Sequence, residues 1–375
     1  MRDTQEAVLA EMRRWGYRYV VTPTLERLDA LALGLDADER RRLFKLMDAD
    51  GSVLALVGER TVPVARLVAG SLRAAPLPLR LCYAGPVLTN DPGRFTRRRE
   101  AYQVGAELVG ASGPVADAEV IALAVRCLDA AGLRRYQVDV GHSEFFLGLL
   151  DGLALPADLK PDVRAALAQR DFVALEALLA GTPLRSAEHE LLLRFPALRG
   201  DAGILDAAGA LVRNRRSERA LEELARVHEL LRAHGLGAAV SLDLGSIRNF
   251  PAGMLRPARP RHRVHDPPRP DGEVLRLSGA TGGLTRLDVA VAWSPAGLEA
   301  ALRLAGSLRM FGMRAVLDTE PRRLAAALEW RSALGAAHLL HVGGGPTVAW
   351  SAGASSRVRR LPAEQVVARL AEPDG

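Results

Sequence analysis

Two polar side chains, Gln103 and Glu107, lie in an alternating segment that begins at Tyr102 and ends at Val109. Alternation with period two predicts a strand, on which both side chains project from one face about 13 Å apart. Gly105 lies between them and leaves room for a ligand, because glycine weakens a strand unless close approach is needed. An amide and a carboxylate beside a gap suit a small molecule with donors, such as an imidazole or an amino group. An amphipathic strand whose polar face meets water fits the spacing equally well.

The segment that precedes this strand is rich in arginine. Its arginines are Arg94, Arg97, Arg98 and Arg99. A cluster of this kind can bind phosphate, and a solvated turn explains it as well. An apolar run from Tyr83 to Leu88 comes before the cluster, so two predicted strands flank a polar loop.

This strand–loop–strand segment resembles motif 2 of the class II aminoacyl-tRNA synthetases, in its histidyl-tRNA synthetase form. The shared residues are Gly85-Pro86, Gly93-Arg94, Arg99-Glu100, Gln103, Gly105 and Glu107. The resemblance implies that Gln103 and Glu107 bind histidine and adds Arg99 to the candidate site. Thr89 stands where the synthetases have their ATP-binding arginine.

Two earlier segments extend the resemblance. Residues 14–17 and 21–26 are similar to motif 1, which implies a homodimer through this region. Residues 56–66 are similar to the family's Leu-Arg-Pro-Glu/Asp-x-Thr segment, although Val57 and Gly58 replace its arginine and proline. The matching residues, Glu59 and Thr61, are implied to bind the amino group of histidine.

Residues 141–250 resemble the ATP phosphoribosyltransferase regulatory subunits, a family of histidyl-tRNA synthetase paralogues in histidine biosynthesis. Arg248 matches a synthetase arginine and is expected to meet the carboxylate of histidine, while Pro251-Ala252-Gly253 replaces a pair of tyrosines. The candidate histidine-binding residues are therefore Glu59, Thr61, Arg99, Gln103, Glu107 and Arg248.

The chemistry of ATP activation is not expected from this chain. Besides Thr89, no motif 3 arginine can be placed near the glycine-rich residues 279–283. Phosphoryl chemistry depends on fixed positive charge where negative charge develops. The resemblance thus implies a non-catalytic regulatory subunit without a cofactor. Its implied partner is a short-form catalytic ATP phosphoribosyltransferase, and histidine is its implied effector.

The predicted fold is α+β, with a class II synthetase-like antiparallel sheet flanked by helices. We expect one domain over residues 1–285, with a helical insertion at about 143–236, and a shortened anticodon-binding-like α/β domain over 286–375. In the second domain, strands alternate with helices from Asp288 onward, which predicts a largely parallel sheet. Gly343-Gly344-Gly345 is expected to form a turn between two strands.

Composition argues against several other classes of protein, such as nucleic-acid-binding, secreted, membrane and metal-binding proteins. The formal charge is +6, but of 50 basic residues only Lys45 and Lys160 are lysines, so we attribute the basicity to coding bias and not to nucleic-acid binding. Cys82 and Cys127 form no paired motif, which indicates packing and a reducing cytoplasm. From the sequence we expect no secretory signal and no membrane span, and its histidines and cysteines do not have metal-ligand spacing. His262 and His265 lie in a proline- and arginine-rich run, residues 257–271, which we expect to form a loop.

Three rival interpretations stay open. A working histidyl-tRNA synthetase would need the missing arginines. A purely structural activator would dimerise and bind the catalytic subunit while its own histidine pocket is inactive. An RNA-binding remnant would use residues 288–375, but the arginines of the chain are dispersed and are not interleaved with aromatic side chains in the way that stacks bases.

Overall fold

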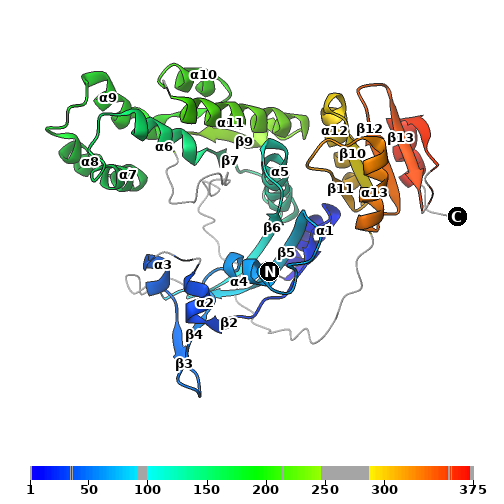
Figure 1. Cartoon of the computed structure of the whole chain (residues 1–375), viewed down its shortest axis with the longest axis horizontal. Coiled ribbons are helices and arrows are strands. Elements are labelled where there is room, and N and C mark those ends of the chain that lie inside the picture. The colour runs from blue at the N-terminus through cyan, green and yellow to red at the C-terminus, as the bar shows by residue number, and fades with distance from the viewer. Residues whose placement is uncertain are drawn as a thin grey trace. The chain divides into compact units, whose positions relative to one another are not determined.

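The computed structural model describes residues 2–33, 35, 37–90, 99–212, 214–245, 287–353, 355 and 357–371 (Figure 1). Its contacts divide the chain into two compact units. The first unit contains residues 1–111, 130–132 and 272–375, and the second contains 112–129 and 133–271. Each unit combines helices with sheets, and the α+β class is confirmed.

The first unit is built around a long antiparallel strand pair. Strand β5 (Leu79–Leu88) pairs with β6 (Glu100–Val109), and β1 (Arg18–Tyr19) joins the free edge of β5 in parallel. The predicted strand at Tyr102–Val109 is therefore confirmed. Helix α1 (Arg2–Arg14) precedes β1 and buries Leu9 and Met12, as its amphipathic pattern predicts.

A second, smaller sheet in the same unit consists of β2 (Leu25–Arg27), β4 (Val53–Leu56) and β3 (Lys45–Met47), in that order. The turn over residues 48–51 joins β3 to β4, and its Asp50-Gly51 pair is typical of hairpin turns. The amide of Asp48 donates to the carbonyl of Ser52 (2.9 Å), and Gly51 has a positive φ of 83°. The accompanying helices are α2 (Leu28–Ala32), α3 (Ala37–Arg41) and α4 (Thr61–Ala69).

The C-terminal part of the first unit is a five-stranded sheet in the order β11-β10-β12-β13-β14. Its strands are β10 (Val289–Trp293), β11 (Ala315–Leu317), β12 (His338–Val342), β13 (Thr347–Ala352) and β14 (Arg359–Pro362). Its helices are α12 (Leu298–Met310), α13 (Leu324–Leu334) and α14 (Ala363–Ala371), with a short 3-10 turn, η3 (Pro295–Gly297), before α12.

This sheet corrects one prediction. Strand β10 is parallel to β11 and β12, but β12–β13 and β13–β14 are antiparallel, so the sheet is mixed and not largely parallel. The physical reason is the turn at residues 343–346, which is too short for a crossover and returns the chain as a hairpin. The predicted glycine turn between two strands is thereby confirmed.

The second unit contains seven of the fourteen α-helices in the described part of the chain. Its strands β7 (Val138–Val140), β9 (Val240–Asp243) and β8 (Arg199–Gly200) form one sheet in that order. The helices are α5 (Pro114–Ala130), α6 (Ser143–Gly152), α7 (Lys160–Gln169), α8 (Phe172–Leu179), α9 (Ser186–Arg194), α10 (Gly203–Gly209) and α11 (Arg215–Ala233). Two 3-10 turns are η1 (Phe195–Ala197) and η2 (Gly237–Ala239).

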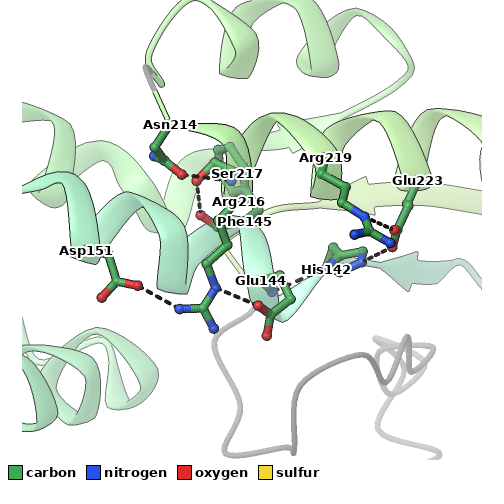
Figure 2. Close-up of polar contacts among 9 residues, drawn as sticks. All are labelled: His142, Glu144, Phe145, Asp151, Asn214, Arg216, Ser217, Arg219 and Glu223. Carbon is green, nitrogen blue, oxygen red and sulfur yellow. Dashed lines mark hydrogen bonds and ion pairs between the residues drawn. The ribbon is translucent and has the colours of Figure 1, made fainter.

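Polar contacts join α6 to the start of α11 (Figure 2). The side chain of Asn214 accepts from the amide of Ser217 (2.9 Å) and caps α11, while the Ser217 hydroxyl donates to the carbonyl of Phe145 (2.8 Å). Arg216 donates to both Glu144 and Asp151, at 2.6 Å each. The bond from Asn214 satisfies an amide at the start of α11 that would otherwise lack a partner, and the other bonds link α6 to α11.

Candidate functional site

The candidate site is assembled from the β5–β6 strand pair and the N-terminus of α4. Across the pair, Gly85 lies opposite Gln103, Tyr83 opposite Gly105 and Leu81 opposite Glu107.

Cys82 is fully buried on β5, and burial raises the pKa of its thiol to about 12, so packing is its role.

Glu59 caps the first turn of α4. Its Oε2 accepts from the amide of Thr61 (3.0 Å), and its Oε1 accepts from the amide of Val62 (2.9 Å). A carboxylate at this position satisfies free amides and interacts favourably with the helix dipole. Each oxygen keeps a second lone pair. The carboxylate is therefore fixed in place and can still accept from an ammonium group.

Arg60 is a central residue of the site that sequence reasoning missed. Its amide donates to Oε1 of Gln103 (2.9 Å), and its side chain is only 3% exposed. The guanidinium donates to the carbonyl and hydroxyl of Thr22 (3.1 and 3.0 Å), to the hydroxyl of Thr24 (3.1 Å) and to the carbonyl of Pro86 (2.8 Å). Burial lowers the pKa of Arg60.

Gly85 is what lets this guanidinium lie against β5. A Cβ atom at position 85 would lie 2.6 Å from Nε of Arg60, which real contacts do not allow. The sequence signal for this packing was the pairing of an arginine after Glu59 with a glycine inside a predicted strand.

Gln103 has a fixed orientation in this arrangement. Because its Oε1 faces the amide of Arg60, its Nε2 group is the end that remains to donate to a ligand.

The prediction that Gly105 leaves space for a ligand is wrong, because the ring of Tyr83 occupies that space. A Cβ atom at position 105 would lie 2.5 Å from Cζ of Tyr83. The Tyr83 hydroxyl donates to Oε1 of Glu107 (3.1 Å) and has the Thr61 side chain as a second hydrogen-bond neighbour. Burial, followed by the charge of Glu107, raises the pKa of Tyr83 well above its usual range.

The structure thus brings four of the six predicted residues into one connected network. Glu59 and Thr61 belong to the α4 end of the network, and Gln103 and Glu107 belong to β6. Arg99 is exposed, and its guanidinium lies 5.8 Å from the ring centre of Phe44.

Several predicted features lie outside the described residues. These are Arg248, Arg94, Arg97, Arg98, the tyrosine replacement at 251–253, the run 257–271 and the glycine-rich residues 279–283. Within the described ranges, no three His, Cys, Asp or Glu side chains are grouped as metal ligands. The same ranges contain no helix with the length and apolar character needed to span a membrane.

The fold and this strand pair define a histidyl-tRNA synthetase-like chain. The family model described as histidyl-tRNA synthetase matches residues 1–252. A solved structure from Bacillus halodurans, described as an ATP phosphoribosyltransferase regulatory subunit/histidyl-tRNA synthetase, has the same fold, with a TM-score of 0.64. That structure is 24% identical, and the match covers 92% of this chain and 94% of that one.

Curated relatives give the narrower assignment. The ATP phosphoribosyltransferase regulatory subunit of Desulforamulus reducens is 31% identical over 368 residues, covering 91% of both chains. The proteins of the same name from Syntrophotalea carbinolica and Moorella thermoacetica are 42% and 39% identical, over 63% and 67% of this chain. The chain spans 56% and 64% of these two relatives' lengths. This chain belongs to the family of ATP phosphoribosyltransferase regulatory subunits.

Proposed function

We propose that this chain is a non-catalytic regulatory subunit of ATP phosphoribosyltransferase that acts in the cytoplasm, in the first step of histidine biosynthesis. Its partner would be the short-form catalytic subunit. The observation that carries the proposal is a contrast between two groups of residues. The residues implied to bind histidine are present and linked by hydrogen bonds, whereas Thr89, just after β5, stands where a synthetase has its ATP-binding arginine.

We further propose that histidine is the effector. The carboxylate of Glu59 and the side chain of Thr61 would hold its amino group, and Glu107 would meet the imidazole. Gln103 would orient the ligand through its free Nε2 group, and Arg248 and Arg99 complete the set inferred from the resemblance. Histidine would then stabilise one state of the complex more than another.

The test is co-purification with a short-form phosphoribosyltransferase, followed by an activity assay with and without histidine. We expect the pair to be active, and histidine to inhibit it about 5- to 150-fold, the range for typical coupling energies. Failure to form a complex, or a catalytic subunit equally active alone, contradicts the regulatory proposal. Pyrophosphate exchange that depends on histidine would support a working synthetase instead.

A second candidate is a structural activator whose pocket binds nothing. The specific observation in its favour is that Tyr83 fills the space over Gly105 and that Glu107 already accepts its hydroxyl. A Glu107→Ala variant separates the two functions. A sensor loses histidine inhibition and keeps basal activity, whereas a scaffold is unaffected. Thr24→Ser, which keeps the hydroxyl that Arg60 uses, is the matched control.

We also propose that the chain forms a homodimer through the motif 1-like region, residues 14–17 and 21–26. Val21 is 71% exposed and Leu25 is 44% exposed, so apolar side chains of this segment are accessible to a second copy of the chain. Val21→Glu should convert a dimer into a monomer in light scattering, while Val173→Glu, at an 81% exposed position on α8, should not. We also keep the domain boundary near residue 286, just before β10, as a proposal.

A further inference from the structure

A cavity of about 160 Å³ lies beside the capping residue Glu59, in the first unit. Its apolar lining residues are Leu31, Leu35, Leu43 and Val62, and its polar lining residues are Glu39, Arg42, Glu59 and Thr89, together with Gly58. Tyr83, Gln103 and Glu107 do not line it. The cavity is therefore distinct from the strand face described above, although Glu59 borders it.

Two of the residues that line the cavity, Gly58 and Thr89, are small. Thr89 stands in place of an arginine and Gly58 in place of a proline in the synthetase-like pattern. The two lie side by side, because a Cβ atom on Gly58 would contact Cγ2 of Thr89 at 3.7 Å and Cδ2 of Leu43 at 3.2 Å. Smaller side chains leave space where neighbours cannot collapse.

Backbone hydrogen bonds hold the walls of this cavity in place. The amide of Asn90 donates to the carbonyl of Arg42 (2.7 Å), and the amide of Leu88 donates to the carbonyl of Val57 (2.9 Å). The residue between them, Thr89, donates its amide to the carbonyl of Arg99 (2.9 Å). The segment that carries Arg42 is thereby tied to the end of β5, so the lining side chains are positioned by fixed backbone.

Size and charge define the class of ligand. Ligand pockets for drug-sized molecules measure about 300–1,000 Å³, so this one suits a molecule of the size of a free amino acid and excludes a nucleotide. Glu39 and Glu59 are lining residues whose carboxylates can accept from an ammonium group, and the guanidinium of the lining residue Arg42 can donate to a carboxylate. The leucines and Val62 leave an apolar wall for a hydrocarbon side chain.

We propose that this cavity is a second small-molecule site, which binds a free α-amino acid with an apolar side chain. Thr89, which stands where the synthetase-like pattern has an arginine, is one of its lining residues. The inference goes beyond the proposed function, since it needs neither the catalytic subunit nor the network of Tyr83 and Glu107.

The test is isothermal titration of the full chain with L-valine, L-leucine and L-histidine, and with AMP as a nucleotide. We expect L-valine or L-leucine to bind, and AMP not to bind. Thr89→Leu fills the cavity and should weaken binding at least tenfold. Thr89→Val has the same shape as threonine and should stay within threefold of the parent chain. Glu107→Ala should leave this binding unchanged, whatever it does to histidine.

Arg42→Gln provides a variant that keeps the fold, because Arg42 is exposed. It should weaken amino-acid binding at least tenfold, with an unchanged melting temperature. The inference is overturned if no aliphatic amino acid binds at millimolar concentration, if Thr89→Leu or Arg42→Gln binds as the parent does, or if AMP binds. Binding of L-histidine alone, lost in Glu107→Ala, would support the proposed effector site and overturn this second one.

Discussion

Replacing Gly105 with alanine should destabilise the first unit, although the same change usually stabilises a strand or helix. The new Cβ atom would lie 2.5 Å from Cζ and 2.8 Å from Cε2 of Tyr83, whose ring is 3% exposed and cannot move into solvent without loss of packing. Overpacking of this kind costs about 1–3 kcal/mol. Displacing the Tyr83 hydroxyl from Glu107 costs about 0.5–1.5 kcal/mol more. Alanine regains about 0.5–1 kcal/mol through its lower backbone entropy.

Together these terms give an expected net loss of about 0.5–4 kcal/mol in the free energy of unfolding. Urea unfolding followed by tryptophan fluorescence measures it, because all four tryptophans lie in the first unit, at positions 15, 293, 330 and 350. Gly306→Ala is the matched control. It lies inside α12 with no atom within 4 Å of the added Cβ, and it should stabilise the same unit by about 0.5–1 kcal/mol.

A double-mutant cycle tests the cause. In a Tyr83→Leu background, the cost of Gly105→Ala should fall by at least about 0.5 kcal/mol, because the clashing ring is gone. The reasoning is refuted if Gly105→Ala is as stable as the parent chain, or if its cost is the same with and without the tyrosine ring.

Three further predictions concern other buried or half-buried groups. Arg60→Met should lower the free energy of unfolding by about 2–4 kcal/mol, because it leaves the carbonyl of Pro86 and other buried acceptors unpaired; an unchanged urea midpoint would contradict this. Burial, followed by the charge of Glu223, raises the pKa of Asp117 to about 6, above its unfolded value of about 4. The stabilising contribution of the protonated Asp117 is complete below pH 4 and is lost as the pH rises through 6, so Asp117→Asn should flatten the melting temperature between these values. The Cys82 thiol should resist alkylation at pH 8 in the native chain and react in denaturant, as mass spectrometry can show.

The sequence predicted most of the elements near the site. Alternation at Tyr102–Val109 identified β6, and Asp50-Gly51 is typical of the turn that joins β3 to β4, because both signals are local. The same alternation placed Gln103 and Glu107 on one face, and the network on that face includes both residues.

Sequence reasoning failed where the outcome depended on the partner strand. Gly105 was interpreted as space for a ligand, but the register of β5 places Tyr83 opposite it. The alternation within one strand indicates which of its residues share a face. It does not indicate which side chain of the neighbouring strand lies opposite them, because that depends on the register between the strands. Arg60 was missed for a similar reason, since the acceptors of its guanidinium and amide come from three separate segments, residues 22–24, Pro86 and Gln103. The short, mostly exposed strand β14 likewise had no apolar signal to reveal it.

The internal bonds of the site set how a ligand must bind. Gln103 and Glu107 already accept from Arg60 and Tyr83, so a ligand gains only the difference between its own hydrogen bonds and those it displaces or shares. Such a difference is smaller than the gain in an open pocket lined by unsatisfied groups, and it favours weak binding to the isolated chain. A catalytic partner that shifts Tyr83 away from Gly105 would open the space and release the hydroxyl at the same time. Histidine should therefore bind more tightly to the complex than to this chain alone, and by linkage it should also tighten the complex by the same factor. Titration of histidine with and without the partner, paired with partner affinity with and without histidine, must give equal ratios; unequal ratios, or equal affinity in both states, would exclude this coupling.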